Sequence, residues 1–220
     1  MVLLKKNNSK HFSLVTSVYR DLQYMREEQA DFMRRFIVDH EIRDVLEVGF
    51  YKGKSSAYIA AVLEDLDLGH LVTLDRHPAK KYSPNIHEVL ERLQLSHRVT
   101  PIFAHRSHTW ELGKMVREEP RPQFDLCYFD GGHTWDVTGF GFVLVDMLLR
   151  PGGWIIFDDL NWTIAGSVGR GGSDTYTQYS EDERAAQGVR LVYETLAPRL
   201  GYTDMKEVKE FQWGVARKPL

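Results

Sequence analysis

The sequence is poor in cysteine, in net charge and in long apolar runs, and each shortage excludes a class of protein. Its single cysteine, Cys127, cannot form an intrachain disulfide or a cysteine-based zinc site. With 28 basic and 31 acidic residues the net charge is −3, which provides no basic stripe for nucleic acid. No apolar run approaches the ~20 residues that cross a bilayer, and the opening residues MVLLKKNNSK lack the apolar stretch of a secretion signal. We therefore expect a cytoplasmic protein with no nucleic-acid or membrane partner.

The length of 220 residues and the hydrophobic share of 43% suit a single globular domain. Residues 14–39 place apolar side chains mostly three or four positions apart, which is typical of an amphipathic helix or a helix pair. We expect residues 1–40 to form an N-terminal helical cap on the core, with a homodimer face as the alternative. Residues 41–220 would then form the main domain.

From residue 43 onward, short apolar runs alternate with segments that suit helices. The runs lie at 44–49, 70–75, 98–104, 124–130 and 152–158, with helical segments near 54–66, 85–95, 109–118 and 134–149. This alternation predicts an α/β fold with a Rossmann-like, doubly wound sheet that is mostly parallel and flanked by helices. Two short strands between 203 and 218, joined near Lys209 and Glu210, would add an antiparallel hairpin and bring the sheet to seven strands.

One long segment shows no clear period. Residues 161–180 contain four glycines and many hydroxyl groups, and long loops in compact domains are usually functional or mobile. We predict that this segment is a mobile loop that closes over the site. Ser180 followed by Glu183 is a capping box, which predicts a helix over about 181–199.

A glycine loop, residues 47–55 with the sequence EVGFYKGKS, follows the first predicted strand and opens the next helix. Gly49 and Gly53 allow the backbone to approach a ligand closely, and a helix N-terminus favours an anion. Lys54 and Ser55 suggest one interpretation, a P-loop-like ATP phosphotransferase. Only three residues separate the glycines, however, whereas a P-loop has four.

A second interpretation of the glycine loop uses two acidic residues. Glu47 precedes Gly49 by two positions, and Asp75 ends the second predicted strand, where an acid can accept hydrogen bonds from ribose hydroxyls. An Asp after a strand also commonly caps a turn. Both roles of Asp75 stay open from the sequence.

Three acidic residues end the fourth and fifth predicted strands: Asp130 in FDGGH, and Asp158 and Asp159 in FDDLNW. The carboxyl ends of neighbouring parallel strands are where α/β proteins bind ligands. Three converging carboxylates repel one another, and a hard divalent cation such as Mg²⁺, Mn²⁺ or Ca²⁺ would relieve that repulsion. His133 lies three residues after Asp130 and can accept a proton near pH 7.

The glycine loop, taken with Glu47 and Asp75, resembles motif I and the acidic motif of class I S-adenosylmethionine-dependent methyltransferases. The D-x-x-base pattern at 130–133 and the acidic pair 158–159 resemble the metal-dependent type, namely catechol O-methyltransferase and the sugar O-methyltransferases of natural-product pathways. The resemblance spans roughly residues 44–220. His133 follows the sugar enzymes, where the catechol enzymes have lysine, and Asp159 stands where the catechol enzymes have Asn.

The resemblance implies an S-adenosylmethionine-dependent, divalent-metal-assisted O-methyltransferase acting on a hydroxyl of a small molecule, such as a sugar, polyol or catechol-like natural product. His133 would be the catalytic base, and the metal ligands would be Asp130, Asp158 and Asp159. The resemblance also implies contacts to the methionine, ribose and adenine parts of the cofactor. The residues that would make them are Glu47, Gly49, Tyr51, Gly53, Ser55, Asp75, His105, Ser107 and Asp130.

Some alternatives remain open at this stage. A non-catalytic regulator that binds S-adenosylmethionine would not need the acidic residues, and a metal-independent N-methyltransferase would leave them unexplained. Aromatic residues could form a platform for a ring or a sugar face of the acceptor: Trp135, Trp162, Tyr176 and Tyr179.

Overall fold

The computed structural model describes residues 9–167 and 178–220. The chain divides into two compact units, Met1–His108 and Thr109–Leu220. The strands are assigned to a seven-stranded sheet in the order β3-β2-β1-β4-β5-β7-β6. The predicted fold class, a mostly parallel sheet that ends in an antiparallel hairpin, is confirmed.

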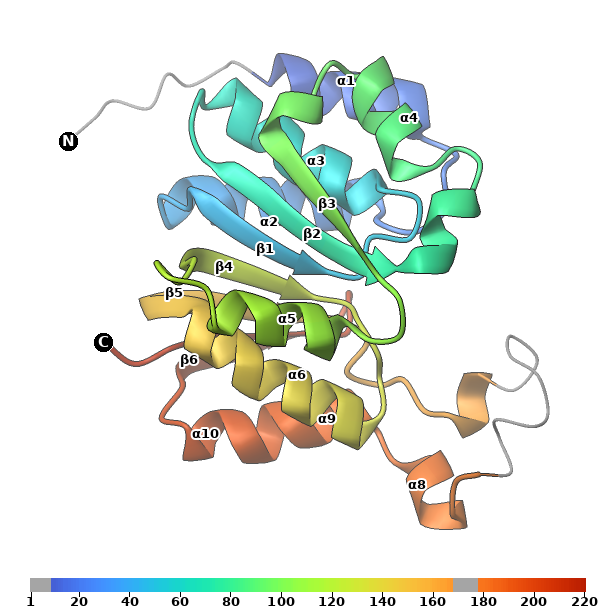
Figure 1. Cartoon of the computed structure of the whole chain (residues 1–220), viewed down its shortest axis with the longest axis vertical. Helices are drawn as coiled ribbons and strands as arrows, with labels where there is room; N and C mark the ends of the chain where they lie inside the picture. The colour runs from blue at the N-terminus through green and yellow to red at the C-terminus, as the bar shows by residue number, and fades with distance from the viewer. Residues whose placement is uncertain (1–8, 168–177) are drawn as a thin grey trace. The chain divides into compact units, whose positions relative to one another are not determined.

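The first unit alternates helices with three parallel strands (Figure 1). Its elements are α1 (Lys10–Tyr19), α2 (Glu27–Asp39), β1 (Asp44–Val48), α3 (Lys54–Asp65), β2 (His70–Arg76), η1 (His77–Lys81), α4 (Ile86–Arg92), η2 (Ser96–Arg98) and β3 (Val99–Ala104). Residues 14–39 thus form a pair of helices with a break between them.

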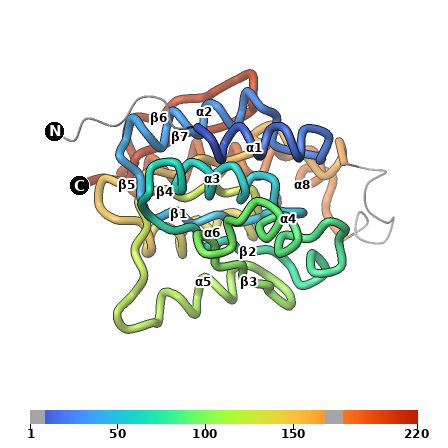
Figure 2. Tube along the Cα trace, turned by 90° about the horizontal axis from the view of Figure 1, so that it is seen from above, coloured from blue at the N-terminus to red at the C-terminus, as the bar shows by residue number. Residues whose placement is uncertain are grey.

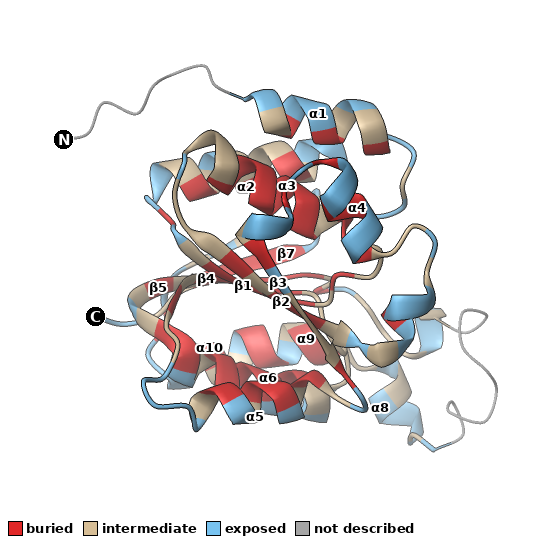
Figure 3. Ribbon diagram, turned by 45° about the horizontal axis from the view of Figure 1, so that its top comes forward, coloured by how far each residue is buried: buried red, intermediate tan, exposed pale blue. Residues whose placement is uncertain are grey.

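Helix α3 is the centre of the helical layer in this unit. Its residues from Ser56 to Leu63 are all buried (Figure 3). Both α1 and α2 pack on it, and α1 and α3 run side by side in Figure 2. The two N-terminal helices bury their apolar faces here, through Phe12, Val15, Tyr19, Ala30, Met33 and Ile37.

The second unit contains the antiparallel hairpin. Its elements are α5 (His108–Val116), β4 (Phe124–Phe129), α6 (Trp135–Leu148), β5 (Leu149–Phe157), η3 (Ala165–Ser167), α8 (Glu181–Ala185), α9 (Gly188–Leu191), the π-helical η4 (Val192–Leu196), α10 (Ala197–Arg199), β6 (Thr203–Val208) and β7 (Trp213–Arg217). β4 pairs in parallel with β5, while β7 pairs antiparallel with both β5 and β6. Cys127 is buried inside β4.

The helix predicted over 181–199 is interrupted. The capping box of Ser180 and Glu183 is present, but α8 ends at Ala185 and the next residue has an extended backbone. α9 begins at Gly188, where the chain passes close to the backbone of residues 133–135. The interruption lies next to this tertiary contact, which helical propensity does not report.

Strand β5 begins at Leu149, three residues earlier than the sequence predicts. Pro and Gly at 151–153 suggested a turn, but Leu149 already pairs with Phe124 across an irregularity in the register. Arg150 donates to Asp125 at 2.5 Å in the same stretch.

Among the described residues, no helix has both the length and the apolar character needed to cross a bilayer.

Candidate active site

The glycine loop bends sharply between β1 and α3. Gly49, Tyr51 and Gly53 all have positive φ, at 94°, 50° and 89°. The amide of Gly49 donates to the Leu74 carbonyl at 2.7 Å, which fixes the loop to the end of β2. A Cβ at Gly53 would lie 2.7 Å from Cγ1 of Ile86, so both the backbone angle and the available space require glycine there.

Asp75 fastens the same loop from the end of β2. One carboxylate oxygen accepts the amides of Phe50 at 3.0 Å and Tyr51 at 2.6 Å, and the other accepts the amide of Arg76 at 2.6 Å. This arrangement is the turn-capping role that the sequence left open. A carboxylate has about four acceptor positions, so the predicted ribose contact stays compatible with it.

Glu47 is fully buried in β1. One of its oxygens accepts the hydroxyls of Ser56 and of Thr73, the latter at 2.6 Å. The other oxygen, Oε1, is buried without a hydrogen-bond partner among the described residues. Burial raises the pKa of Glu47 to about 7, although the hydrogen bonds from Ser56 and Thr73 oppose the shift.

The P-loop interpretation is wrong, and Lys54 gives the structural reason. Its ammonium donates to the carbonyls of Arg20 at 3.2 Å and Leu22 at 2.6 Å, and the side chain is buried. Burial lowers its pKa. A lysine used in this way is not presented to a phosphate.

The predicted adenine contacts lie after β3. His105 is exposed and its ring stacks on that of His77, with centroids 5.1 Å apart and planes 10° apart. Ser107 is half-buried and immediately precedes α5. The role of these residues, like that of Tyr51 and Ser55, stays a prediction.

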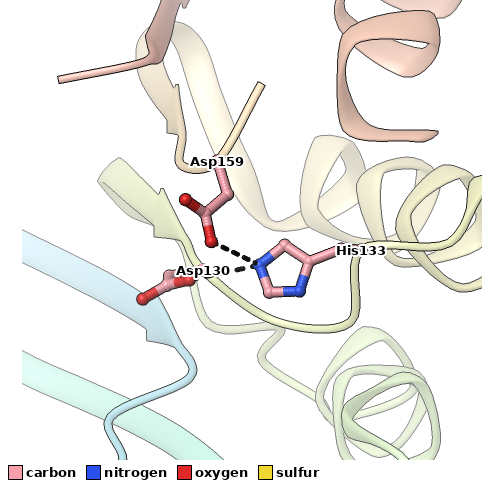
Figure 4. Close-up of side chains that lie close together, drawn as sticks. All are labelled: Asp130, His133 and Asp159. Carbon is pink, nitrogen blue, oxygen red and sulfur yellow. Dashed lines mark ion pairs between the residues drawn. The ribbon is translucent and has the colours of Figure 1, made fainter. Parts of the chain in front are cut away.

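In the second unit, Asp130 and His133 follow β4 and Asp159 follows β5, and the three side chains lie close together (Figure 4). One ligand atom from each lies within 4.8 Å of the others. Nε2 of His133 is 3.5 Å from Oδ1 of Asp130 and 3.4 Å from Oδ2 of Asp159. We call these three residues the acidic cluster. They are a donor set that a cation could bridge.

His133 is held from its flank by Trp162, whose ring stacks on it with centroids 5.1 Å apart. The imidazole is largely buried, and Nε2 has no hydrogen-bond partner among the described residues. Burial lowers the pKa of His133, while the charges of Asp159 and Asp158 oppose this. The neutral imidazole is therefore favoured, which is the form that accepts a proton or binds a metal.

Asp158 is placed differently from the other two predicted metal ligands. Its carboxylate is buried, accepts the Tyr128 hydroxyl, and accepts the Asp159 amide at 2.7 Å. Burial, followed by the charges of Asp130 and Asp159, raises its pKa well above the ordinary value. The three nearest ligand atoms thus include His133 rather than Asp158, and a metal role for Asp158 stays a prediction.

Two residues that the sequence did not single out, Gly188 and Arg190, support the acidic cluster. Gly188 approaches so closely that an added Cβ would lie 2.4 Å from the His133 carbonyl. Arg190 donates to the Asn161 side chain at 2.6 Å and to Glu207 at 2.8 Å. The start of α9 thereby contacts both segments that carry the cluster. Only the glycine within a predicted helix gave any signal of this in the sequence.

The predicted aromatic platform is partly described. Trp162 contacts His133 as stated, and Trp135 is 45% exposed at the start of α6. Residues 168–177 of the predicted mobile loop, Tyr176 among them, lie outside the described residues. The loop's closure over the site stays a prediction.

Comparison with known proteins agrees with this geometry. A family model described as a methyltransferase domain matches residues 46–160, just over half of the chain. No curated protein matches the chain.

Solved structures show the same fold at low sequence identity. The O-methyltransferase TomG from Streptomyces achromogenes, which takes part in tomaymycin synthesis and was solved with S-adenosylmethionine, is 20% identical, with a TM-score of 0.67 over 100% of this chain and 93% of that one. An O-methyltransferase from Bacillus cereus, solved with S-adenosylhomocysteine, is 22% identical, with a TM-score of 0.64 over 99% and 94%. A putative caffeoyl-CoA O-methyltransferase from Staphylococcus aureus is 17% identical, with a TM-score of 0.67 over 96% and 93%. The chain therefore belongs to the methyltransferase-domain family, and it shares its fold with O-methyltransferases that were solved with S-adenosylmethionine or S-adenosylhomocysteine.

Proposed function

We propose that this enzyme transfers the methyl group to a hydroxyl oxygen of a small molecule and that a divalent metal assists the transfer. The observation that carries the proposal is the acidic cluster, in which a buried imidazole faces two carboxylates at 3.4 and 3.5 Å. Such a group of acidic residues with one neutral base suits the deprotonation of a weakly acidic hydroxyl. The similar structures are those of O-methyltransferases, which favours oxygen as the acceptor atom here.

The first unit fits S-adenosylmethionine. The N-terminus of α3 follows Gly53 without a side-chain cap, so its first amides remain available to a ligand. Glu47 provides a buried oxygen that lacks a partner among the described residues, and a cofactor carries amino and hydroxyl groups that could donate to acids in this unit. We assign Glu47, Gly49, Tyr51, Gly53, Ser55 and Asp75 to cofactor binding, with His105 and Ser107 near the adenine.

The second unit fits a divalent cation. Carboxylate oxygens are the ligands that Mg²⁺, Ca²⁺ and Mn²⁺ prefer, and two of the three clustered donors are carboxylates. Asp130 and Asp159 would hold the ion, and Asp158 would complete the set through its remaining acceptor positions. When bound, the metal lowers the pKa of a coordinated substrate hydroxyl and fixes its position.

His133 is the group that we assign to the proton. Its neutral Nε2 is the form that accepts a proton from the substrate hydroxyl, and Trp162 restrains the ring. The adjacent carboxylates of Asp130 and Asp159 would stabilise the imidazolium that forms. Trp162 also provides a flat surface on which a ring or sugar face of the acceptor could pack.

The geometry also allows His133 to be a metal ligand rather than the base, and one experiment separates the two roles. Mn²⁺ binding is measured by electron paramagnetic resonance, and methyl transfer is measured as S-adenosylhomocysteine release with a panel of catechol, polyol and sugar acceptors. As a base, His133→Asn lowers turnover by ~10²–10⁴-fold and leaves Mn²⁺ affinity nearly unchanged. As a ligand, it lowers both.

Asp159→Asn and His97→Asn complete the design. Asp159→Asn is expected to weaken Mn²⁺ binding at least tenfold, because it removes a charged ligand. His97 is a histidine of the first unit whose side chain is 58% exposed, and its replacement is expected to change neither quantity. Full activity in EDTA would rule out metal assistance, and unchanged turnover of His133→Asn would rule out the proposed base.

A further inference from the structure

The segment that joins α1 to α2, residues 20–26, has an unusual backbone that displays an aromatic side chain. Tyr24 and Met25 are consecutive non-glycine residues with positive φ, at 62° and 43°. Met25 is buried, whereas Tyr24 is 63% exposed. Left-handed conformations at such residues cost free energy and persist only where the surroundings enforce them. We call residues 20–26 the connector.

Contacts with the start of α3 and with the glycine loop enforce this conformation. The Lys54 ammonium binds the carbonyls of Arg20 and Leu22 at 3.2 and 2.6 Å. The hydroxyl of Tyr51 donates to the side chain of Gln23 at 3.3 Å. The connector is therefore attached both to the glycine loop and to the helix that this loop opens.

Tyr51 is the point at which the connector and the glycine loop share ring contacts. The Tyr24 ring meets it edge-on, with centroids 5.1 Å apart and planes at 86°. The Tyr51 ring also contacts the ring of Tyr82, with centroids 4.7 Å apart and planes at 50°. Tyr51 itself has a left-handed backbone, and its amide is bound by Asp75. A residue in that conformation depends on its neighbours to keep its side chain in place.

We propose that Tyr24 is a positioning residue for S-adenosylmethionine, acting through Tyr51. The left-handed backbone at Tyr24 brings little burial of its own ring, so burial of that side chain does not account for its conformation. What the conformation achieves is a ring contact that fixes Tyr51 within the glycine loop. A loop that is already ordered loses less conformational entropy when its ligand binds. This inference rests on the proposed cofactor role of the glycine loop.

The test is calorimetric titration with S-adenosylhomocysteine, which requires no acceptor and no turnover. An edge-to-face aromatic contact corresponds to about 2- to 13-fold in a dissociation constant. Tyr24→Ala is therefore expected to raise the Kd by about that factor, while Tyr24→Phe, which keeps the ring, retains the wild-type value. The melting temperature of the unliganded protein should fall by no more than about 2–4 °C, because only one ring contact of a mostly exposed side chain is lost.

Two controls make the outcome decisive. Trp110→Ala removes another aromatic side chain of 63% exposure, from α5, and is expected to leave the Kd unchanged. In a double-mutant cycle, Tyr24→Ala should add little to the Kd of Tyr51→Ala, because the contact is already absent there. If Tyr24→Ala lowers the melting temperature strongly, Tyr24→Leu replaces it in the same cycle.

The inference fails if Tyr24→Ala binds like the wild type, or if its effect persists in full in the Tyr51→Ala background. Those results would leave the proposed cofactor site intact. Failure of the wild-type protein to bind S-adenosylhomocysteine would instead contradict the proposed cofactor site itself.

Discussion

Gly188 offers the sharpest test of how tertiary packing shapes the acidic cluster. An alanine Cβ at this position would lie 2.4 Å from the His133 carbonyl and 2.7 Å from the Trp135 amide, whereas ordinary contact begins near 3.4 Å. Either α9 or the His133 segment must therefore move by about 1 Å. The opposing atoms belong to the backbone, so no side-chain rotation can relieve the contact.

Propensity and packing predict opposite signs for Gly188→Ala. Within a helix, alanine is favoured over glycine by roughly 0.5–1 kcal/mol. Overpacking against fixed atoms costs about 1–3 kcal/mol, so we expect a net loss of stability of about 1–2 kcal/mol. A shift of 1 Å in a catalytic group can lower turnover by about 10²-fold, and we also expect Mn²⁺ to bind more weakly.

The assay pairs urea unfolding with Mn²⁺ titration, and Gly139→Ala is the matched control. Gly139 lies in α6, and an added Cβ there would meet only the ends of two side chains, Cδ1 of Leu196 at 3.4 Å and Cγ2 of Val192 at 3.7 Å. That variant should be as stable as the wild type or slightly more stable. A Gly188→Ala protein with wild-type stability and wild-type Mn²⁺ affinity would refute the packing argument.

Two further predictions concern the first unit. The pKa of Glu47 lies near 7 in the folded chain against an ordinary 4.5, so between these pH values the folded state holds a proton that the unfolded state has lost. The free energy of unfolding should therefore fall as pH rises through that window, by the order of 3 kcal/mol. Urea unfolding at pH 5 and pH 7.5 should show a smaller fall for Glu47→Gln than for the wild type, and an equal fall would contradict the assignment. Gly53→Ala should destabilise the protein by about 1–3 kcal/mol and weaken S-adenosylhomocysteine binding, because its φ is +89° and its Cβ would lie 2.7 Å from Ile86. Gly113→Ala, with no atom within 4 Å of the added Cβ, is the control, and equal behaviour of the two variants in calorimetry would count against the loop argument.

Much of the fold could be predicted from local sequence patterns. Alternating apolar runs and helical segments predicted the strands β1 to β5, because buried parallel strands are short and apolar and their crossover helices are longer. The strands β6 and β7 were predicted separately, from two short strand-like segments between residues 203 and 218. Boundaries at 149–153 and 186–188 were wrong, since long-range pairing and a backbone contact override turn and helix signals there.

The candidate site likewise contains residues that could be predicted from local sequence and contacts that could not. Gly49, Gly53, Glu47 and Asp75 could be singled out because their spacing around one strand end is set by local geometry. The sequence could not show that Asp75 binds the loop amides, or that Lys54 binds the connector carbonyls and so is not a phosphate ligand. Hydrogen-bond partners 24 to 34 residues apart depend on how the strands and helices assemble.

What the sequence by itself determined is the chemistry available: a glycine loop, three acidic residues at strand ends, one histidine near them, and no second cysteine or basic stripe. What only the tertiary structure decided is which of those groups meet. His133 faces Asp130 and Asp159 because β4 and β5 are paired and α9 contacts both following segments, while the carboxylate of Asp158 accepts the Tyr128 hydroxyl. Side-chain type is fixed residue by residue, but distance and burial, which set pKa and metal affinity, are fixed only by packing.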